Sequence, residues 1–250
     1  MIRLFIERLF AQGPYLMYMV VLFGTLGFHP EKFLAAIPGL GGRVTRVIIY
    51  TGAQASGTER SMSEAAISKV IRTLDAMGTS YDHRQFSSPW AFSEIFRVFL
   101  HDLQSYPPQD VVFNLTGGPK TMTVAATMAC LMHGVRVIYV PEELGGPGAA
   151  VELPLLRIRY SQVLTSSQRR ILHAIRERLP RTLDELARHL KLRNATVSYH
   201  VGRLEELGAL TLVRDESNRT FRTPQLTPAG EIMLEAEEIL VRSGGCHRES

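Results

Sequence analysis

The sequence contains little cysteine and no recognisable metal-ligand pattern. Its 250 residues include two cysteines, Cys130 and Cys246, which can form at most one disulfide. A disulfide-stabilised secreted scaffold is therefore excluded, and we expect a protein of the reducing cytoplasm. The eight histidines form no pair at helical ligand spacing and accompany no Cys-x-x-Cys motif, so a zinc site is not indicated. We expect neither a bound metal nor a cofactor.

Charged residues are missing from Leu9 to Phe28, and a run of this length suggests a membrane span or a signal peptide. Glycine and proline interrupt the run, Glu7 stands in the flank that would have to be basic, and no small-residue cleavage site follows. We therefore expect a β-strand from Met17 to Phe23, preceded by an N-terminal extension over residues 1–16, and no membrane association. Membrane insertion or secretion is the alternative.

The positive charge is distributed unevenly along the chain. Residues 1–156 contain 12 Lys or Arg and 12 Asp or Glu, whereas residues 157–222 contain 14 and 7, and residues 223–250 contain 2 and 5. A neutral segment followed by a basic one indicates that only the second part of the chain meets a polyanion.

Short β-rich runs alternate with helical stretches up to Val140. The expected strands are Met17–Phe23, Arg46–Tyr50, Tyr81–Phe86, Asp110–Asn114 and Val135–Val140. The expected helices are Pro30–Ile37, Ser61–Met77, Pro89–Gln104 and Pro119–His133. This alternation predicts an α/β fold with a Rossmann-like, doubly wound parallel sheet of strand order 3-2-1-4-5. The helix after Pro119 has no polar face, which favours burial in a subunit interface or within the domain.

Two glycine-rich loops follow the first and fourth strands, which are neighbours at the point where the strand order reverses. They read Gly24-Thr25-Leu26-Gly27-Phe28 and Asn114-Leu115-Thr116-Gly117-Gly118-Pro119-Lys120-Thr121. The second loop places glycines, a lysine and hydroxyl groups before a helix, an arrangement that favours a phosphate group. The loop is not a Walker A motif, and the chain has no Gly-x-Gly-x-x-Gly. A tight connection with a solvated Lys120 is the alternative.

The spacing beyond residue 160 predicts a small α+β winged helix-turn-helix domain. The expected elements are helices Ser166–Arg178, Leu183–Leu190 and Asn194–Leu207, a hairpin of Ala209–Arg214 with Arg219–Thr223, and a last helix Pro228–Val241. Side chains that point away from the core of this domain are candidates for DNA contact. They are Asn194, Thr196, Ser198, Tyr199, His200 and Arg203 on the third helix and Arg214, Arg219 and Arg222 on the wing. A module used only for protein contacts is the alternative.

These elements divide the chain into five parts. After the extension 1–16 come the Rossmann-like domain 17–156, a connector 157–164, the winged helix-turn-helix domain 165–243 and a tail 244–250.

The loop Asn114–Met122, together with Leu22–Phe28, resembles the CARF domain of CRISPR-associated proteins. A CARF domain followed by a winged helix resembles the CRISPR-associated transcriptional regulators of the archaeal type. The resemblance covers about residues 17–240 and is most specific at Thr116-Gly117-Gly118-Pro119-Lys120.

This resemblance implies a homodimer that binds a cyclic oligoadenylate, commonly cyclic tetra-adenylate, across its two-fold axis, and that binds double-stranded DNA. The implied ligand-binding residues are Gly24, Thr25, Leu26, Gly27, Thr51, Gly52, Asn114, Thr116, Gly117, Gly118, Lys120 and Thr121. The expected function is a ligand-responsive transcriptional regulator of CRISPR loci. Two alternatives remain: a metal-independent ring nuclease that uses Lys120 and Thr25, and a DNA-binding dimer that responds to no ligand.

Overall fold

The computed structural model describes residues 19–40, 43–53, 56–142, 149–155, 164–177, 182–214 and 222–244. These form two compact units, and each part of the chain is described by itself. The expected extension 1–16, connector residues 157–163, Arg219 and tail residues 245–250 lie outside the described ranges. Within those ranges, no helix has both the length and the apolar character that a bilayer span requires.

A six-stranded sheet is the centre of the N-terminal part. Its strands are β1 (Met19–Thr25), β2 (Arg43–Gly52), β3 (Ser80–Phe86), β4 (Val111–Asn114), β5 (Arg136–Tyr139) and β6 (Val151–Leu153). They lie in the order β3-β2-β1-β4-β5-β6, and β6 alone pairs antiparallel. The expected Rossmann-like sheet and its 3-2-1-4-5 order are therefore confirmed, and β1 lies directly beside β4.

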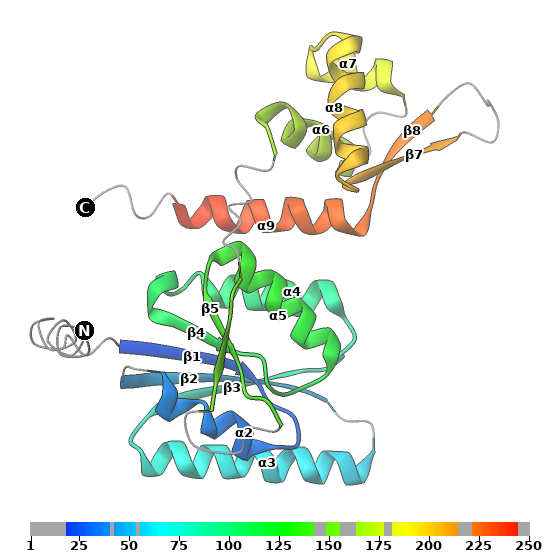
Figure 1. Cartoon of the computed structure of the whole chain (residues 1–250). Helices are drawn as coiled ribbons and strands as arrows, with labels where there is room; N and C mark the ends of the chain where they lie inside the picture. The colour runs from blue at the N-terminus through cyan, green and yellow to red at the C-terminus, as the bar shows by residue number, and fades with distance from the viewer. Residues whose placement is uncertain are drawn as a thin grey trace, which may run out of the picture. The chain divides into compact units, whose positions relative to one another are not determined.

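Helices lie on both faces of this sheet. Figure 1 shows α2 (Pro30–Ala35) and α3 (Gly57–Ala76) on one face and α5 (Lys120–His133) on the other. The chain also forms α4 (Phe92–Leu103) and two short 3-10 helices, η1 (Ile37–Gly39) and η2 (Pro108–Asp110). On α5, Val124 is exposed, whereas Ala125, Ala126 and Cys130 are buried.

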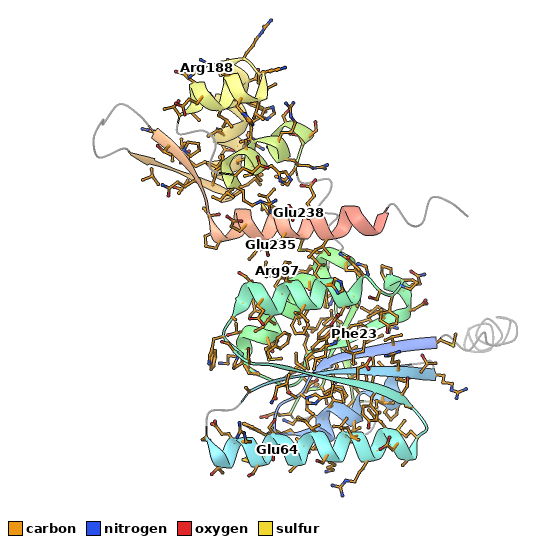
Figure 2. All side chains as sticks on the ribbon, turned by 180° about the vertical axis from the view of Figure 1, so that it is seen from behind. Phe23, Glu64, Arg97, Arg188, Glu235 and Glu238 are labelled. Carbon is orange, nitrogen blue, oxygen red and sulfur yellow. The ribbon has the colours of Figure 1, made fainter. Side chains whose placement is uncertain are left out.

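The strands are apolar because each face of the sheet is buried. On the face covered by α2 and α3, Leu22 and Ile49 pack in one cluster with Val70. On the opposite face, the rings of Phe23 and Phe113 stack with their centroids 6.0 Å apart. Figure 2 shows Phe23 inside the sheet domain. Burial on both faces explains the nearly continuous apolar runs of the sequence.

Several element boundaries differ from the expected ones, and two of these differences matter for the candidate site. Strand β1 ends at Thr25 rather than Phe23, because Gly24 and Thr25 continue the parallel pairing with Ile49 and Tyr50 of β2. Helix α4 begins at Phe92 rather than Pro89. As a result, Trp90 belongs to the loop that connects β3 with α4.

The C-terminal part is a winged helix-turn-helix fold, as expected. It consists of α6 (Ser166–Arg176), α7 (Leu183–Leu190), α8 (Asn194–Glu206), β7 (Leu210–Arg214), β8 (Arg222–Leu226) and α9 (Pro228–Gly244). The strands β7 and β8 pair antiparallel as the wing. Ile171, Leu186, Val201 and Leu234 share one buried cluster, so α6, α7, α8 and α9 enclose a single core.

Candidate functional site

The loops that follow β1 and β4 are in close backbone contact. The hydroxyl group of Thr25 donates a hydrogen bond to the carbonyl of Gly117. A Cβ atom on Gly117 would lie 2.7 Å from the Gly27 nitrogen and 2.8 Å from the Thr25 oxygen, so only glycine fits there. Gly118 has φ +87°, a conformation that other residues rarely adopt. The expectation that these two loops lie side by side is confirmed.

Two of the polar residues expected to contact a ligand, Asn114 and Thr116, hold the β4–α5 loop in shape. The side-chain oxygen of Asn114, which is fully buried, accepts hydrogen bonds from the amide of Thr116, 3.0 Å away, and from the Thr116 hydroxyl. That hydroxyl in turn accepts a hydrogen bond from the Val140 amide at 2.9 Å. The network therefore connects the loop to the end of β5.

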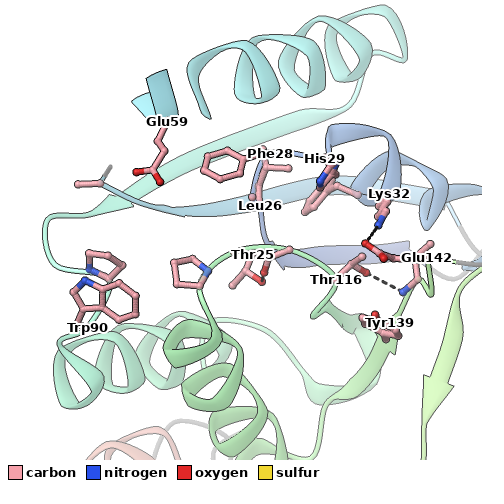
Figure 3. A pocket seen from close by; sticks show the side chains of 18 of the residues that line it. Thr25, Leu26, Phe28, His29, Lys32, Glu59, Trp90, Thr116, Tyr139 and Glu142 are labelled. Atoms are coloured by element: carbon pink, nitrogen blue, oxygen red, sulfur yellow. Dashed lines mark hydrogen bonds and ion pairs between the residues drawn. The ribbon is translucent and has the colours of Figure 1, made fainter. Parts of the chain in front are cut away.

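A pocket of about 700 Å³ opens at this edge of the sheet, and Figure 3 shows it from close by. Six of the residues predicted to bind a ligand line it: Thr25, Leu26, Gly27, Thr116, Gly117 and Gly118. The first residues of α5 follow directly after this loop, and the first amide groups of a helix have no partner within the helix. This side of the pocket is therefore favourable for an anion.

The other six predicted residues do not line the pocket: Gly24, Thr51, Gly52, Asn114, Lys120 and Thr121. Thr51 is buried, and its hydroxyl lies 2.9 Å from Nε2 of His83. Lys120 is exposed at the start of α5. The two residues assigned to the nuclease alternative are thus differently placed, since Thr25 lines the pocket and Lys120 does not.

Sequence reasoning missed the aromatic side of the pocket. Trp90, the only tryptophan of the chain, lines the pocket, and the residue is 71% exposed. Tyr139 and Phe28 also line it. The available signal was the Ser-Ser-Pro-Trp segment directly after β3, because the carboxyl ends of parallel strands share one edge of the sheet. An exposed indole beside a glycine loop is well suited to stack on a nucleotide base.

An ion pair lies on the side of the pocket opposite Trp90 (Figure 3). The ammonium group of Lys32, on α2, is 2.7 Å from Oε1 of Glu142, which follows β5. The hydrogen bond from Lys32, aided by its charge, lowers the pKa of Glu142. Of the described lining residues, Lys32 is the one lysine or arginine, and Glu59 is the second carboxylate. Across the described part of the chain, no group of three or more metal-ligating side chains is arranged to hold a metal ion.

The second candidate site is the outer face of α8. Asn194, Ser198, Tyr199 and Arg203 are exposed, and Thr196 and His200 are half-buried, because Val197, Val201 and Leu204 face the core. The side-chain nitrogen Nδ2 of Asn194 donates a hydrogen bond to Oδ1 of Asp184, on α7, at 2.7 Å. This bond fixes the start of α8 against the preceding helix.

Six basic residues of this domain fall into two groups. Arg169 and Arg176 of α6 pair with Glu237 and Glu238 of α9, so these cations are held by α9. A second group is exposed around the turn before α8 and on the wing: Arg188, Lys191, Arg193 and Arg222. Figure 2 labels Arg188 on α7 and Glu238 on α9. The side chain of Arg214, on β7, is outside the described set.

Comparison with known families identifies both parts of the chain. Residues 20–154 match the family model of the Csa3 CRISPR-associated Rossmann-like domain, which covers more than half of the sequence. The chain belongs to this family. Residues 163–213 match a helix-turn-helix domain family. The chain therefore combines a Csa3-type, CRISPR-associated Rossmann-like domain with a helix-turn-helix domain.

Several solved structures resemble part of the chain at low TM-score. A Staphylococcus aureus MepR mutant bound to an oligodeoxyribonucleotide has 19% identity and a TM-score of 0.32, over 34% of this chain and 64% of its own. The PcaV transcriptional regulator from Streptomyces coelicolor, in complex with its natural ligand, has 23% identity and a TM-score of 0.30, over 33% and 60%. The transcriptional regulator BldR from Sulfolobus solfataricus has 27% identity and a TM-score of 0.29, over 35% of this chain and 66% of its own. The chain thus covers less than two thirds of the length of each of these three regulators. No curated protein matches the chain.

The close approach at Gly117 generates a stability prediction. Gly117→Ala should lower the free energy of unfolding by about 1–3 kcal/mol, because the new methyl group meets backbone atoms that cannot move aside cheaply. Gly57→Ala is the matched control, since a Cβ there meets no heavy atom within 4 Å, and it should change stability by less than about 1 kcal/mol. Chemical denaturation measures both variants. Equal stability of Gly117→Ala and wild type would contradict the close contact.

Proposed function

We propose that this Csa3-family protein is a homodimeric, cyclic oligoadenylate-responsive transcriptional regulator of CRISPR loci. Its Rossmann-like domain binds the ring, and its winged helix reads DNA. The observation that carries the proposal is the composition of one pocket. Gly117 and Gly118, in the loop that leads into α5, line the same cavity as the exposed Trp90. Phosphate groups and bases therefore both find suitable surfaces in it.

The size of the pocket supports a dimer as the binding unit. A cavity of about 700 Å³ is of the size that holds a drug-sized ligand, so one chain accommodates about half of a four-nucleotide ring. A ring with two-fold symmetry suits two such pockets related by a two-fold axis. We therefore propose one ring of cyclic tetra-adenylate for two chains.

The C-terminal domain supports recognition of double-stranded DNA. The outer face of α8 presents Asn194, Ser198 and Tyr199 to solvent, and the exposed cations Lys191 and Arg193 directly precede this helix in the chain. In a dimer, two copies of α8 read two half-sites about one helical turn apart in a palindromic operator. The ring acts as an effector if it binds one arrangement of the dimer more tightly than another.

Trp90→Ala tests the ligand half of the proposal. We expect the wild-type protein to bind one intact cyclic tetra-adenylate ring per two chains in calorimetric titration. The variant should bind it about tenfold more weakly or worse, because base–aromatic stacking contributes about 1–3 kcal/mol per base. Tyr199→Ala is the control, since it removes an equally exposed aromatic ring outside the pocket, and its ring affinity should equal that of wild type.

The ligand is checked by chromatography after long incubation with the protein. Intact ring supports the sensor, whereas consumed ring would assign the protein to the ring nucleases. No binding of the ring by the wild-type protein would overturn the proposed ligand.

Tyr199→Ala tests the DNA half of the proposal. We expect it to weaken binding to an operator fragment by about 1–3 kcal/mol, the cost of losing one contact to a base edge. Fluorescence anisotropy with a labelled duplex measures this loss. Trp90→Ala should bind the same duplex as wild type does in the absence of ring. A wild-type affinity for Tyr199→Ala would remove the outer face of α8 from the interface.

A further inference from the structure

The charges that line the pocket raise a problem for an anionic ligand. Its described lining contains the carboxylates of Glu59 and Glu142 but only one lysine or arginine, Lys32. That lysine is engaged by Glu142 at 2.7 Å. A phosphodiester placed beside this pair would meet a neutralised cation and a nearby negative charge, which disfavours binding.

The two partners of this ion pair are held very differently. The side chain of Lys32 is 23% exposed, whereas that of Glu142 is 75% exposed. Lys32 is therefore fixed largely by packing on α2, and Glu142 approaches it from solvent. An ion pair of this exposed kind contributes little net stability, so a stronger anion can displace the carboxylate. The carboxylate of Glu142 is ionised at neutral pH, as an ordinary glutamate is, and the hydrogen bond from Lys32 lowers its pKa further.

We propose that Lys32 binds a phosphate group of the nucleotide ligand, and that Glu142 occupies this position on Lys32 in the ligand-free protein. The carboxylate is an internal competitor that must be displaced when the ring binds. It raises the ligand concentration at which the protein responds. This inference rests on the proposed function, because it assigns a residue and a regulatory contact to the same pocket.

Three further features agree with Lys32 as the phosphate ligand. Lys120, the lysine that the sequence favoured, does not line the pocket. Lys32 lies on the side of the pocket opposite Trp90 (Figure 3). A nucleotide whose base stacks on the indole of Trp90 therefore extends its phosphate groups across the pocket towards Lys32. Lys32 directly precedes Phe33, whose backbone oxygen lies 3.5 Å from the side-chain nitrogen of the buried Asn114. The lysine is thus connected to the β4–α5 loop through the backbone of α2.

Two variants with opposite expected effects test the inference. Calorimetric titration with cyclic tetra-adenylate should give a dissociation constant about fivefold lower for Glu142→Gln, because Lys32 is then free to meet the phosphate. Lys32→Met keeps the aliphatic stem and should raise the dissociation constant about tenfold or more, the usual effect of losing a charge-assisted hydrogen bond.

A matched ion pair outside the pocket supplies the controls. Arg136 and Glu152 pair at 2.8 Å on β5 and β6, and neither lines the pocket. Glu152→Gln and Arg136→Met make the same changes of charge and should leave ring affinity within about twofold of wild type. A similar gain in ring affinity for Glu142→Gln and Glu152→Gln would indicate a general effect of charge. It would overturn the proposed role of Glu142 as a competitor.

Inorganic pyrophosphate separates a failure of this inference from a failure of the proposed function. Its protection of the protein against thermal unfolding is compared between wild type, Lys32→Met and Glu142→Gln. If wild type does not bind the ring, the proposed ligand is wrong. Lys32 is still supported if pyrophosphate protects Glu142→Gln most and Lys32→Met least. If ring and pyrophosphate binding are both the same in all three proteins, or if Glu142→Gln binds more weakly than wild type, the inference is overturned.

Discussion

The contact between the backbones of the β1 and β4 loops is the constraint on which the candidate site depends. Parallel pairing places β1 between β2 and β4, and the absence of a Cβ on Gly117 lets the two loops touch. The Thr25 hydroxyl and the Asn114–Thr116 network then fix the β4–α5 loop to both neighbouring strands. Because α5 begins directly after this loop, the same contact determines where its first turn lies relative to the pocket.

Buried and exposed polar groups have different roles at the pocket. Asn114 and Thr51 are buried and hydrogen-bonded within the protein, as buried polar groups generally are, so they maintain the shape of this edge. Trp90 and the Lys32–Glu142 pair lie at the surface of the cavity, where a ligand can exchange with their present contacts. Residue type alone does not separate these two roles, because each is filled by residues capable of binding a nucleotide.

The sequence predicts most of the fold, and six of the twelve residues it offers as ligand contacts line the pocket. Apolar runs reveal strands buried on both faces, and glycine loops reveal the edge where the strand order reverses. Trp90, Lys32 and Glu142, in contrast, come from three separate segments and look like ordinary surface residues in the sequence. The net charge of a segment is also a limited guide to which residues can contact DNA. Arg169 and Arg176 contribute to the basic surplus of residues 157–222, and yet they pair with glutamates of α9.

Ring binding and DNA binding must be energetically coupled if one chain is to act as a regulator. The most direct measurement is the dissociation constant of an operator duplex, selected with the protein from CRISPR-locus promoter DNA, with and without saturating cyclic tetra-adenylate. We predict a change of about fivefold or more, together with an equal change in ring affinity when the operator is bound. Identical operator affinities in the presence and absence of bound ring would contradict a ligand-responsive regulator.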